Sequence, residues 1–180
     1  AFMRALRNQE GMGARALEFA ILTAARSGEV RGATWEESER NAAVWKVPAS
    51  RMKAGKEHRV PLSPAALALL RAVPRMAGTD LVFPAPRGGL LSDMTLTAVL
   101  RRMGVAAVPH GFRSSFRDWC SERTNYPREV AEMALAHSIG DKVEAAYRRG
   151  DLFDKRRKLM TEWAAFCAKP EPKRGDVVSI

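Results

Sequence analysis

PHGFRSSFRDW, residues 109–119, places His110 three residues before Arg113. If this stretch is helical, the two side chains point to the same side of the helix. An arginine beside a histidine suits a phosphate group that must be held and then transformed, because a guanidinium grips phosphate oxygens and an imidazole moves protons near neutral pH. One such pair is weak evidence, since HxxR arises by chance in many helices. It becomes informative only together with four further motifs in the chain.

The composition predicts a single folded domain with a polyanionic partner. The chain has 180 residues, of which 46% are hydrophobic, which is enough for a packed core and excludes global disorder. Lys and Arg number 30 against 20 Asp and Glu, giving a formal net charge of +10. This balance favours nucleic acid first and an acidic membrane second. We expect one domain over residues 1–168 and a flexible tail over residues 169–180.

The chain carries no pattern that favours a metal site, a disulfide or a membrane anchor. Its two cysteines, Cys120 and Cys167, form no CxxC pair and have no nearby histidine at a metal-binding spacing. No cluster of carboxylates suited to magnesium is apparent. No run approaches the ~20 apolar residues that a membrane-spanning helix needs. We therefore expect no metal, no cofactor and reduced thiols in a bacterial cytoplasmic, nucleoid-associated protein.

The periodicity predicts a mainly α protein with a small antiparallel β-sheet (α+β). Residues 13–26 show the spacing of a buried helix, with Gly28 as its expected C-terminal cap. Residues 43–48 and 57–62 predict a β-hairpin with Lys53 near its tip. Residues 81–84 predict a short strand. Helices are expected at 64–73, 93–103, 111–124, 127–136, 141–149 and 151–168.

Several side chains in these elements form a candidate set for phosphoryl transfer. Two arginines can clamp phosphate oxygens and stabilise the charge that develops on them. A tyrosine hydroxyl beside such a positive cluster can act as a nucleophile, and a lysine can protonate a leaving alkoxide. The residues available for these roles are Arg26, Lys53, His110, Arg113, His137 and Tyr147.

The order of the motifs resembles the catalytic domain of tyrosine recombinases, the phage and genomic-island integrase family. The motifs are LTAARSGEV (22–30), RMKAGKEHRVPLS (51–63), HGFR (110–113), LAHSIGD (135–141) and AYRRGD (146–151). Each motif is common, but all five in this order and at these distances are specific. The resemblance covers about residue 10 to about residue 155.

The resemblance implies a role for each candidate residue. Arg26 and Arg113 would bind the scissile phosphate, and Tyr147 would attack it to form a 3′-phosphotyrosyl link with release of a 5′-hydroxyl. Lys53 would protonate that leaving oxygen, with Lys56 as a competing choice.

The resemblance also implies supporting roles. His110 would serve as proton acceptor and phosphate ligand, and His137 would donate a hydrogen bond to a non-bridging oxygen. Glu29 would orient the neighbouring catalytic groups. The covalent link would preserve the phosphodiester energy, so strand exchange would need neither ATP nor a metal ion.

The partners implied by the resemblance are double-stranded DNA attachment sites and three further copies of the protein. The family works as a homotetramer on DNA, with a monomer expected without DNA, and accessory DNA-bending or directionality proteins can take part. A separate helical core-binding domain normally precedes the catalytic domain and is expected to be absent from this chain. Residues 150–180 are the candidate contact with a neighbouring copy. The segment around Tyr147 is expected to be displaced from the arginines without DNA.

Other interpretations of the same residues stay open at this stage. The chain could be a type IB topoisomerase-like relaxing enzyme or a catalytically inactive DNA-binding module, and a helix-turn-helix regulator fits least. Arg26 could be a cation at a helix C-terminus, and Arg113 could pair with a surface carboxylate. His58 is expected to be structural or exposed rather than catalytic. The basic run at 155–158 could be a solvated helix face or a contact to the DNA backbone.

Overall fold

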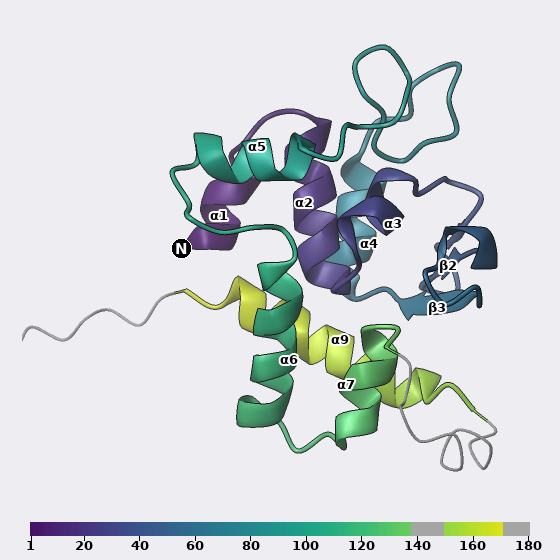
Figure 1. Cartoon of the computed structure of the whole chain (residues 1–180), viewed down its shortest axis with the longest axis vertical. Helices are drawn as coiled ribbons and strands as arrows, with labels where there is room; N and C mark the ends of the chain where they lie inside the picture. The colour runs from purple at the N-terminus through teal and green to yellow at the C-terminus, as the bar shows by residue number, and fades with distance from the viewer. Residues whose placement is uncertain (138–149, 171–180) are drawn as a thin grey trace, which may run out of the picture.

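The computed structural model describes residues 1–137 and 150–170 (Figure 1). The helix expected at 141–149, which contains Tyr147, and most of the expected tail lie outside these residues. The described elements are α1 (Phe2–Arg7), α2 (Met12–Thr23), α3 (Ser27–Arg31), β1 (Ser38–Glu39), β2 (Val44–Val47), a 3-10 turn (Ala49–Arg51), β3 (His58–Pro61), α4 (Pro64–Ala72), α5 (Thr95–Arg102), α6 (Gly111–Arg123), α7 (Arg128–Ala134) and α9 (Phe153–Ala168). The prediction of a mainly α protein with a small antiparallel sheet is confirmed.

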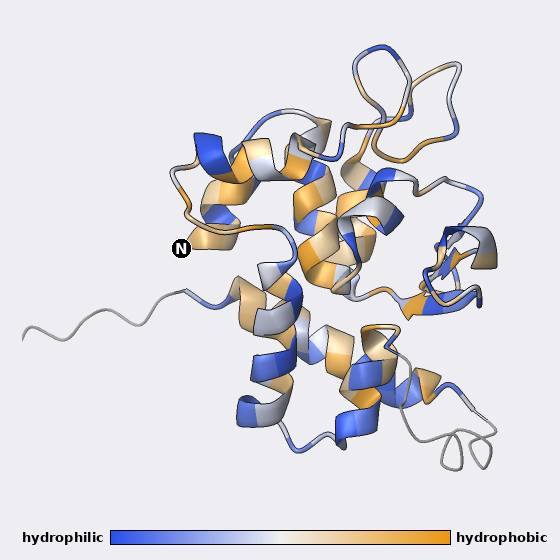
Figure 2. Ribbon diagram, in the orientation of Figure 1, coloured by the Kyte–Doolittle hydropathy of each residue, from blue (hydrophilic) through white to orange (hydrophobic). Residues whose placement is uncertain are grey.

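Helix α2 is the centre of the core. It packs against α1, α3, α4, α5 and α9, and nine of its twelve residues are buried. Figure 2 shows that α2 is largely apolar, as a helix enclosed on most sides must be. Gly13 allows α5 to approach closely, because a Cβ at this position would lie 2.7 Å from Thr95 Cγ2. The position of α2 therefore fixes the elements that surround it.

The C-terminal end of α2 differs from the prediction. The helix ends at Thr23, and Ala24 adopts the left-handed conformation with φ 51°. Arg26 is then the N-cap of the new helix α3, which contains Gly28. The expected glycine cap is wrong because the apolar pattern continues through Ala24 and Ala25, which stay buried while the backbone turns. An apolar pattern shows which residues are buried, but it does not show where a helix ends.

The predicted hairpin is confirmed, and a third strand extends it. Strands β2 and β3 pair antiparallel, with Val44 opposite Pro61 and Val47 opposite His58. The short strand β1 adds to the other edge of β2 and was not predicted, because two residues carry no alternation. Residues 81–84 form only isolated bridges instead of the expected strand. Trp45 anchors the sheet on α2, where its ring lies 5.2 Å from that of Phe19.

Helix α9 crosses back over the chain and lies beside α6 and α7 (Figure 1). Trp163 is buried, its ring meets Phe116 of α6 edge-on, and its indole Nε1 donates to the Ile21 carbonyl at 2.7 Å. Arg156 is 1% exposed and donates to the Arg59 carbonyl at 2.6 Å and to the Asp151 carboxylate at 2.7 Å. The basic run at 155–158 is therefore not a uniformly solvated face.

None of the helices within residues 1–137 and 150–170 is both long and apolar enough to cross a membrane.

We expect Trp163→Phe to lower the free energy of unfolding by about 1 kcal/mol, because phenylalanine keeps most of the ring contacts but loses the buried hydrogen bond to Ile21. Urea unfolding followed by circular dichroism measures the change. Lys158→Ala, at an exposed position of the same helix, should stay within about 0.5 kcal/mol of wild type. Equal stability of the two variants would show that the indole bond contributes nothing.

Candidate active site

Arg113 is a buried arginine that joins three parts of the chain. It projects from the first turn of α6 and is 5% exposed. Its NH2 donates to the Leu135 carbonyl at 2.7 Å, and its NH1 donates to the Ala24 carbonyl. Ala24 lies in the turn between α2 and α3, and Leu135 caps α7. The guanidinium thus connects the HGFR, LTAARSGEV and LAHSIGD motifs through backbone carbonyls, and not through a surface carboxylate.

Glu29 holds Arg26 at the start of α3. Its Oε1 accepts from Arg26 NH1 at 2.7 Å, and its Oε2 accepts from the backbone N–H of Arg26 at 2.9 Å. Glu29 is 5% exposed, whereas the Arg26 side chain is 28% exposed. Arg26 therefore starts a helix instead of ending one. Its guanidinium is fixed on one side and open to solvent on the other.

The charges of this cluster are not balanced. Burial and the charge of Arg26 lower the pKa of Arg113 to about 10, while Glu29 raises it. Arg113 thus remains a cation at neutral pH, close enough to Arg26 to be repelled by it. One carboxylate, Glu29, serves both arginines. An anion placed between the two guanidinium groups would relieve the repulsion, so the cluster favours a negatively charged ligand.

His137 lies beside Arg113 because of the way α7 ends. Ala136 adopts the left-handed conformation with φ 49°, and the His137 N–H donates to the Glu132 carbonyl at 3.0 Å. The Ala136 N–H donates to the Met133 carbonyl at 3.2 Å, which completes a Schellman motif. This turn brings His137 Nε2 to 3.4 Å from Arg113 NH2.

Glu132 is a site residue that the sequence interpretation missed. Its Oε2 lies 2.7 Å from His137 Nδ1, and its Oε1 accepts from Arg117 Nε at 2.9 Å. Burial raises the pKa of Glu132, but the hydrogen bonds from His137 and Arg117 outweigh it, and the net pKa is below the usual range. A negative charge therefore holds the far side of the His137 ring. The available signal was a glutamate five residues before a histidine at a helix end.

The remaining predicted residues are not drawn into this cluster. Lys53 follows the 3-10 turn in the β2–β3 connection, and His110 is the N-cap residue of α6. Both are exposed, and neither side chain bonds to another residue in the described parts of the chain. Tyr147 lies outside the described residues. The structure thus assembles Arg26, Glu29, Arg113 and His137, whereas the Lys53 and His110 side chains make no bond to residues 1–137 or 150–170.

His58 is closer to the site than expected. It is partly buried on β3. Burial and the charge of Arg156 lower its pKa to about 4. Glu29 and a hydrogen bond to the Ala134 backbone raise the pKa less than these effects lower it, and Arg26 lowers it further. His58 is therefore a neutral imidazole at neutral pH, between β3, α3 and the end of α7.

Neither cysteine is suited to a reaction. Both thiols are free, and burial raises the pKa of Cys120 and of Cys167 to about 12. Both stay protonated at neutral pH, where a thiol is a poor nucleophile.

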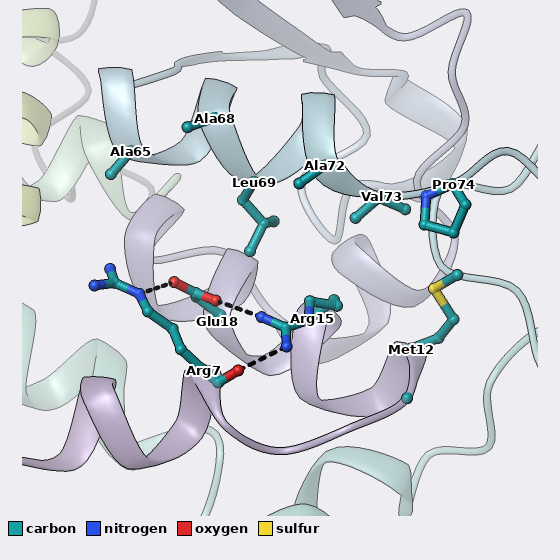
Figure 3. Close-up of a pocket in the computed structure, with 11 residues that line it drawn as sticks. Arg7, Met12, Arg15, Glu18, Ala65, Ala68, Leu69, Ala72, Val73 and Pro74 are labelled. Atoms are coloured by element: carbon teal, nitrogen blue, oxygen red, sulfur yellow. Dashed lines mark hydrogen bonds and ion pairs between the residues drawn. The ribbon is translucent and has the colours of Figure 1, made fainter.

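A pocket of about 690 Å³ lies elsewhere, between α2 and α4 (Figure 3). Ala65, Leu69 and Ala72 form its apolar wall. On the opposite side Glu18 pairs with Arg7 Nε at 2.6 Å and with Arg15 NH1 at 3.4 Å. None of its lining residues belongs to the candidate set. This pocket is therefore separate from the cluster around Arg113.

Comparison with known proteins identifies the family. The sequence pattern of the phage integrase family matches residues 1–151, so the chain belongs to this family. It is 38% identical over 149 residues to the prophage integrase IntA of Escherichia coli K12, covering 80% of this chain and 36% of IntA. It is 32% identical over 171 residues to the integrase of enterobacteria phage P4, covering 84% of this chain and 39% of that protein. The chain thus spans well under half the length of these relatives.

Solved structures show the same fold. An integrase from mycobacterium phage Brujita superposes with a TM-score of 0.69 at 17% identity, covering 89% of this chain and 55% of that one. A lambda integrase tetramer bound to a Holliday junction gives a TM-score of 0.56 at 21% identity, covering 79% of this chain and 46% of that one. The fold is that of tyrosine recombinases.

The low pKa of His58 makes stability depend on pH. The pKa of His58 is 6.5 in the unfolded chain and about 4 in the folded protein. At a pH between these two values, the imidazole is protonated in the unfolded chain and neutral in the folded one. Stability from this group is complete above about pH 6.5 and falls as the pH drops. We expect wild type to lose up to about 2–3 kcal/mol more than His58→Gln between about pH 7 and about pH 4.5, as measured by urea unfolding. Parallel pH curves would contradict this.

Proposed function

We propose that the chain is the catalytic domain of a site-specific DNA recombinase that cuts and rejoins duplex DNA through a covalent 3′-phosphotyrosine intermediate. The observation that carries this proposal is the unbalanced cluster of Arg113, Arg26 and Glu29, in which the charge of Arg26 lowers the pKa of Arg113. A phosphodiester is the anion that suits two such guanidinium groups. The net charge of +10 favours DNA as its source.

In the proposed reaction, Arg26 and Arg113 hold the non-bridging oxygens while the Tyr147 hydroxyl attacks the phosphorus. A bond from the tyrosine oxygen to phosphorus forms, and the bond from phosphorus to the 5′ oxygen breaks. His110 accepts the proton of the tyrosine, and Lys53 gives a proton to the departing 5′ oxygen. One phosphate ester replaces another, so rejoining needs no ATP. The arginines supply the charge stabilisation, and we propose that no metal ion or cofactor takes part.

His137 has a defined part in this scheme. Its Nδ1 faces the Glu132 carboxylate at 2.7 Å and therefore holds a proton. Its Nε2 can then donate to a phosphate oxygen only in the imidazolium form. The Glu29 carboxylate likewise orients Arg26, because it accepts hydrogen bonds from both the backbone N–H and the guanidinium of that residue.

The proposed working unit is larger than this chain. Lambda integrase is seen as a dimer bound to a core site and as a tetramer bound to a Holliday junction. By analogy we propose that this domain, residues 1–168, acts as a tetramer on two DNA attachment sites, with residues 150–180 as the contact between copies. A preceding core-binding domain and accessory DNA-bending or directionality proteins complete the proposed assembly, in the bacterial cytoplasm and on the nucleoid.

A covalent trapping assay tests the chemistry. We expect the protein, mixed with a nicked duplex that carries its attachment-site core, to give a slower band on SDS gels that nuclease treatment removes. Tyr147→Phe should abolish the band, because it removes the attacking oxygen. Arg113→Ala should lower its rate of formation by at least about 100-fold, the usual effect of losing a transition-state donor.

The second tyrosine of the chain supplies the matched control. The Tyr126 hydroxyl bonds to Glu162 Oε1 at 2.6 Å, on the surface between α6 and α9. Tyr126→Phe should leave the covalent band at the wild-type level. A band that persists in Tyr147→Phe would reject the proposed nucleophile. A band together with supercoil relaxation but no strand exchange would favour the topoisomerase-like alternative.

A further inference from the structure

Arg51 occupies a central place between the β-hairpin and α3. It is the last residue of the 3-10 turn Ala49–Arg51, two positions before Lys53. Its NH1 donates to the Glu29 carbonyl at 2.7 Å, and its NH2 pairs with the Glu37 carboxylate. Its side chain is 24% exposed. The Arg51 guanidinium thus joins the β2–β3 connection to α3, through Glu29, and to the segment before β1, through Glu37.

Glu37 ties this arginine to the core. Its side chain is 13% exposed. The oxygen that meets Arg51 also accepts from Trp45 Nε1 at 3.0 Å and lies 3.3 Å from the Thr34 N–H. Trp45 is buried on β2. An ion pair with these additional hydrogen bonds is held far more firmly than an exposed surface pair, whose two side chains move freely.

The Arg51 guanidinium lies in the space that a side chain at Gly32 would occupy. A Cβ at this position would be 2.8 Å from Arg51 NH1, with Cδ of the same arginine 3.5 Å away. The backbone of Gly32 has φ −92° and ψ 7°, which other residues adopt as well. Its lack of a side chain therefore matters for space and not for conformation. The end of α3 is shaped to accept Arg51.

We propose that Arg51 is a positioning residue that holds the proton donor Lys53 in register with the phosphate-binding arginines. Glu29 is the shared element, because its carboxylate holds Arg26 and its carbonyl holds Arg51. The exposed Lys53 side chain has no bond to the described residues, so its place depends on the backbone that Arg51 fixes. This inference rests on the proposed function, in which Lys53 protonates the leaving 5′ oxygen.

The chemistry of the leaving group provides a specific test. An alkoxide leaves poorly unless a general acid gives it a proton, a contribution of roughly 100- to 10,000-fold. A substrate with sulfur in place of the 5′ bridging oxygen releases a thiolate, which needs no such proton because thiols ionise near pH 8.5, roughly. A variant that only misplaces Lys53 should therefore cleave the sulfur substrate normally.

The experiment compares single-turnover cleavage of matched oxygen and sulfur duplexes by the full protein. We expect Arg51→Met to cleave the oxygen substrate at least about 10-fold more slowly than wild type and the sulfur substrate within about 3-fold of it. Lys53→Ala should show the same pattern. Glu37→Gln, which weakens the anchor but keeps the arginine, should show it to a smaller degree. Arg113→Ala should be slow on both substrates, because the phosphate clamp is needed in either case.

The controls separate this inference from the proposed function. A protein that is misfolded or that cannot bind phosphate fails on both substrates, so recovery with sulfur excludes both explanations. Recovery of Lys53→Ala without recovery of Arg51→Met would overturn the positioning role and leave Lys53 as the donor. Wild-type cleavage of the oxygen substrate by Arg51→Met would overturn it as well. If Lys53→Ala were slow on both substrates, the proton donor itself would be wrong. Lys56→Ala tests the competing proton donor: slow cleavage of the oxygen substrate with normal cleavage of the sulfur substrate would move the role from Lys53 to Lys56 and overturn the inference.

Discussion

The site depends on one buried guanidinium. Arg113 binds the carbonyls of Ala24 and Leu135, two positions before Arg26 and His137 respectively. Helices that are far apart in the sequence are thereby brought together at their ends, where turns expose backbone oxygens. Because an unpaired buried charge is strongly unfavourable, these carbonyls and the arginine require each other. The group that binds substrate in the proposed mechanism is thus also a structural element, and folding sets the spacing between the motifs.

The arrangement prepares the site for an anion before the anion arrives. Backbone carbonyls accept hydrogen bonds from Arg113, and the Glu29 carboxylate pairs with Arg26, but repulsion between the two arginines remains. The protein holds them close through contacts made during folding. In the proposed mechanism, a phosphate that binds between them meets groups whose orientation is already fixed, and little reorganisation is needed. Glu132 extends the same principle to His137, since a carboxylate behind the ring sets which nitrogen faces the arginine.

The sequence predicted the helices and strands better than the contacts that join them. The HGFR arginine and the β-hairpin follow from spacing and turn residues. The end of α2 was misplaced because buried alanines continue the apolar pattern past the last helical residue. Glu132 and Arg51 were missed for a different reason. Each acts through a turn or a backbone carbonyl, and such contacts leave no periodic pattern in the sequence. The contacts that hold the cluster around Arg113 together were therefore harder to predict than the helices and strands that carry it.

The left-handed alanine at the end of α7 shows how stiffness is built into the site. Glycine adopts this conformation without steric strain, whereas Ala136 holds it at an expense of roughly 1 kcal/mol. Glycine would also allow many other backbone angles at this point. Alanine restricts the backbone angles at this turn, where His137 Nε2 lies 3.4 Å from Arg113 NH2. The left-handed Ala136 thus lowers the stability of the fold slightly and restricts the backbone next to His137.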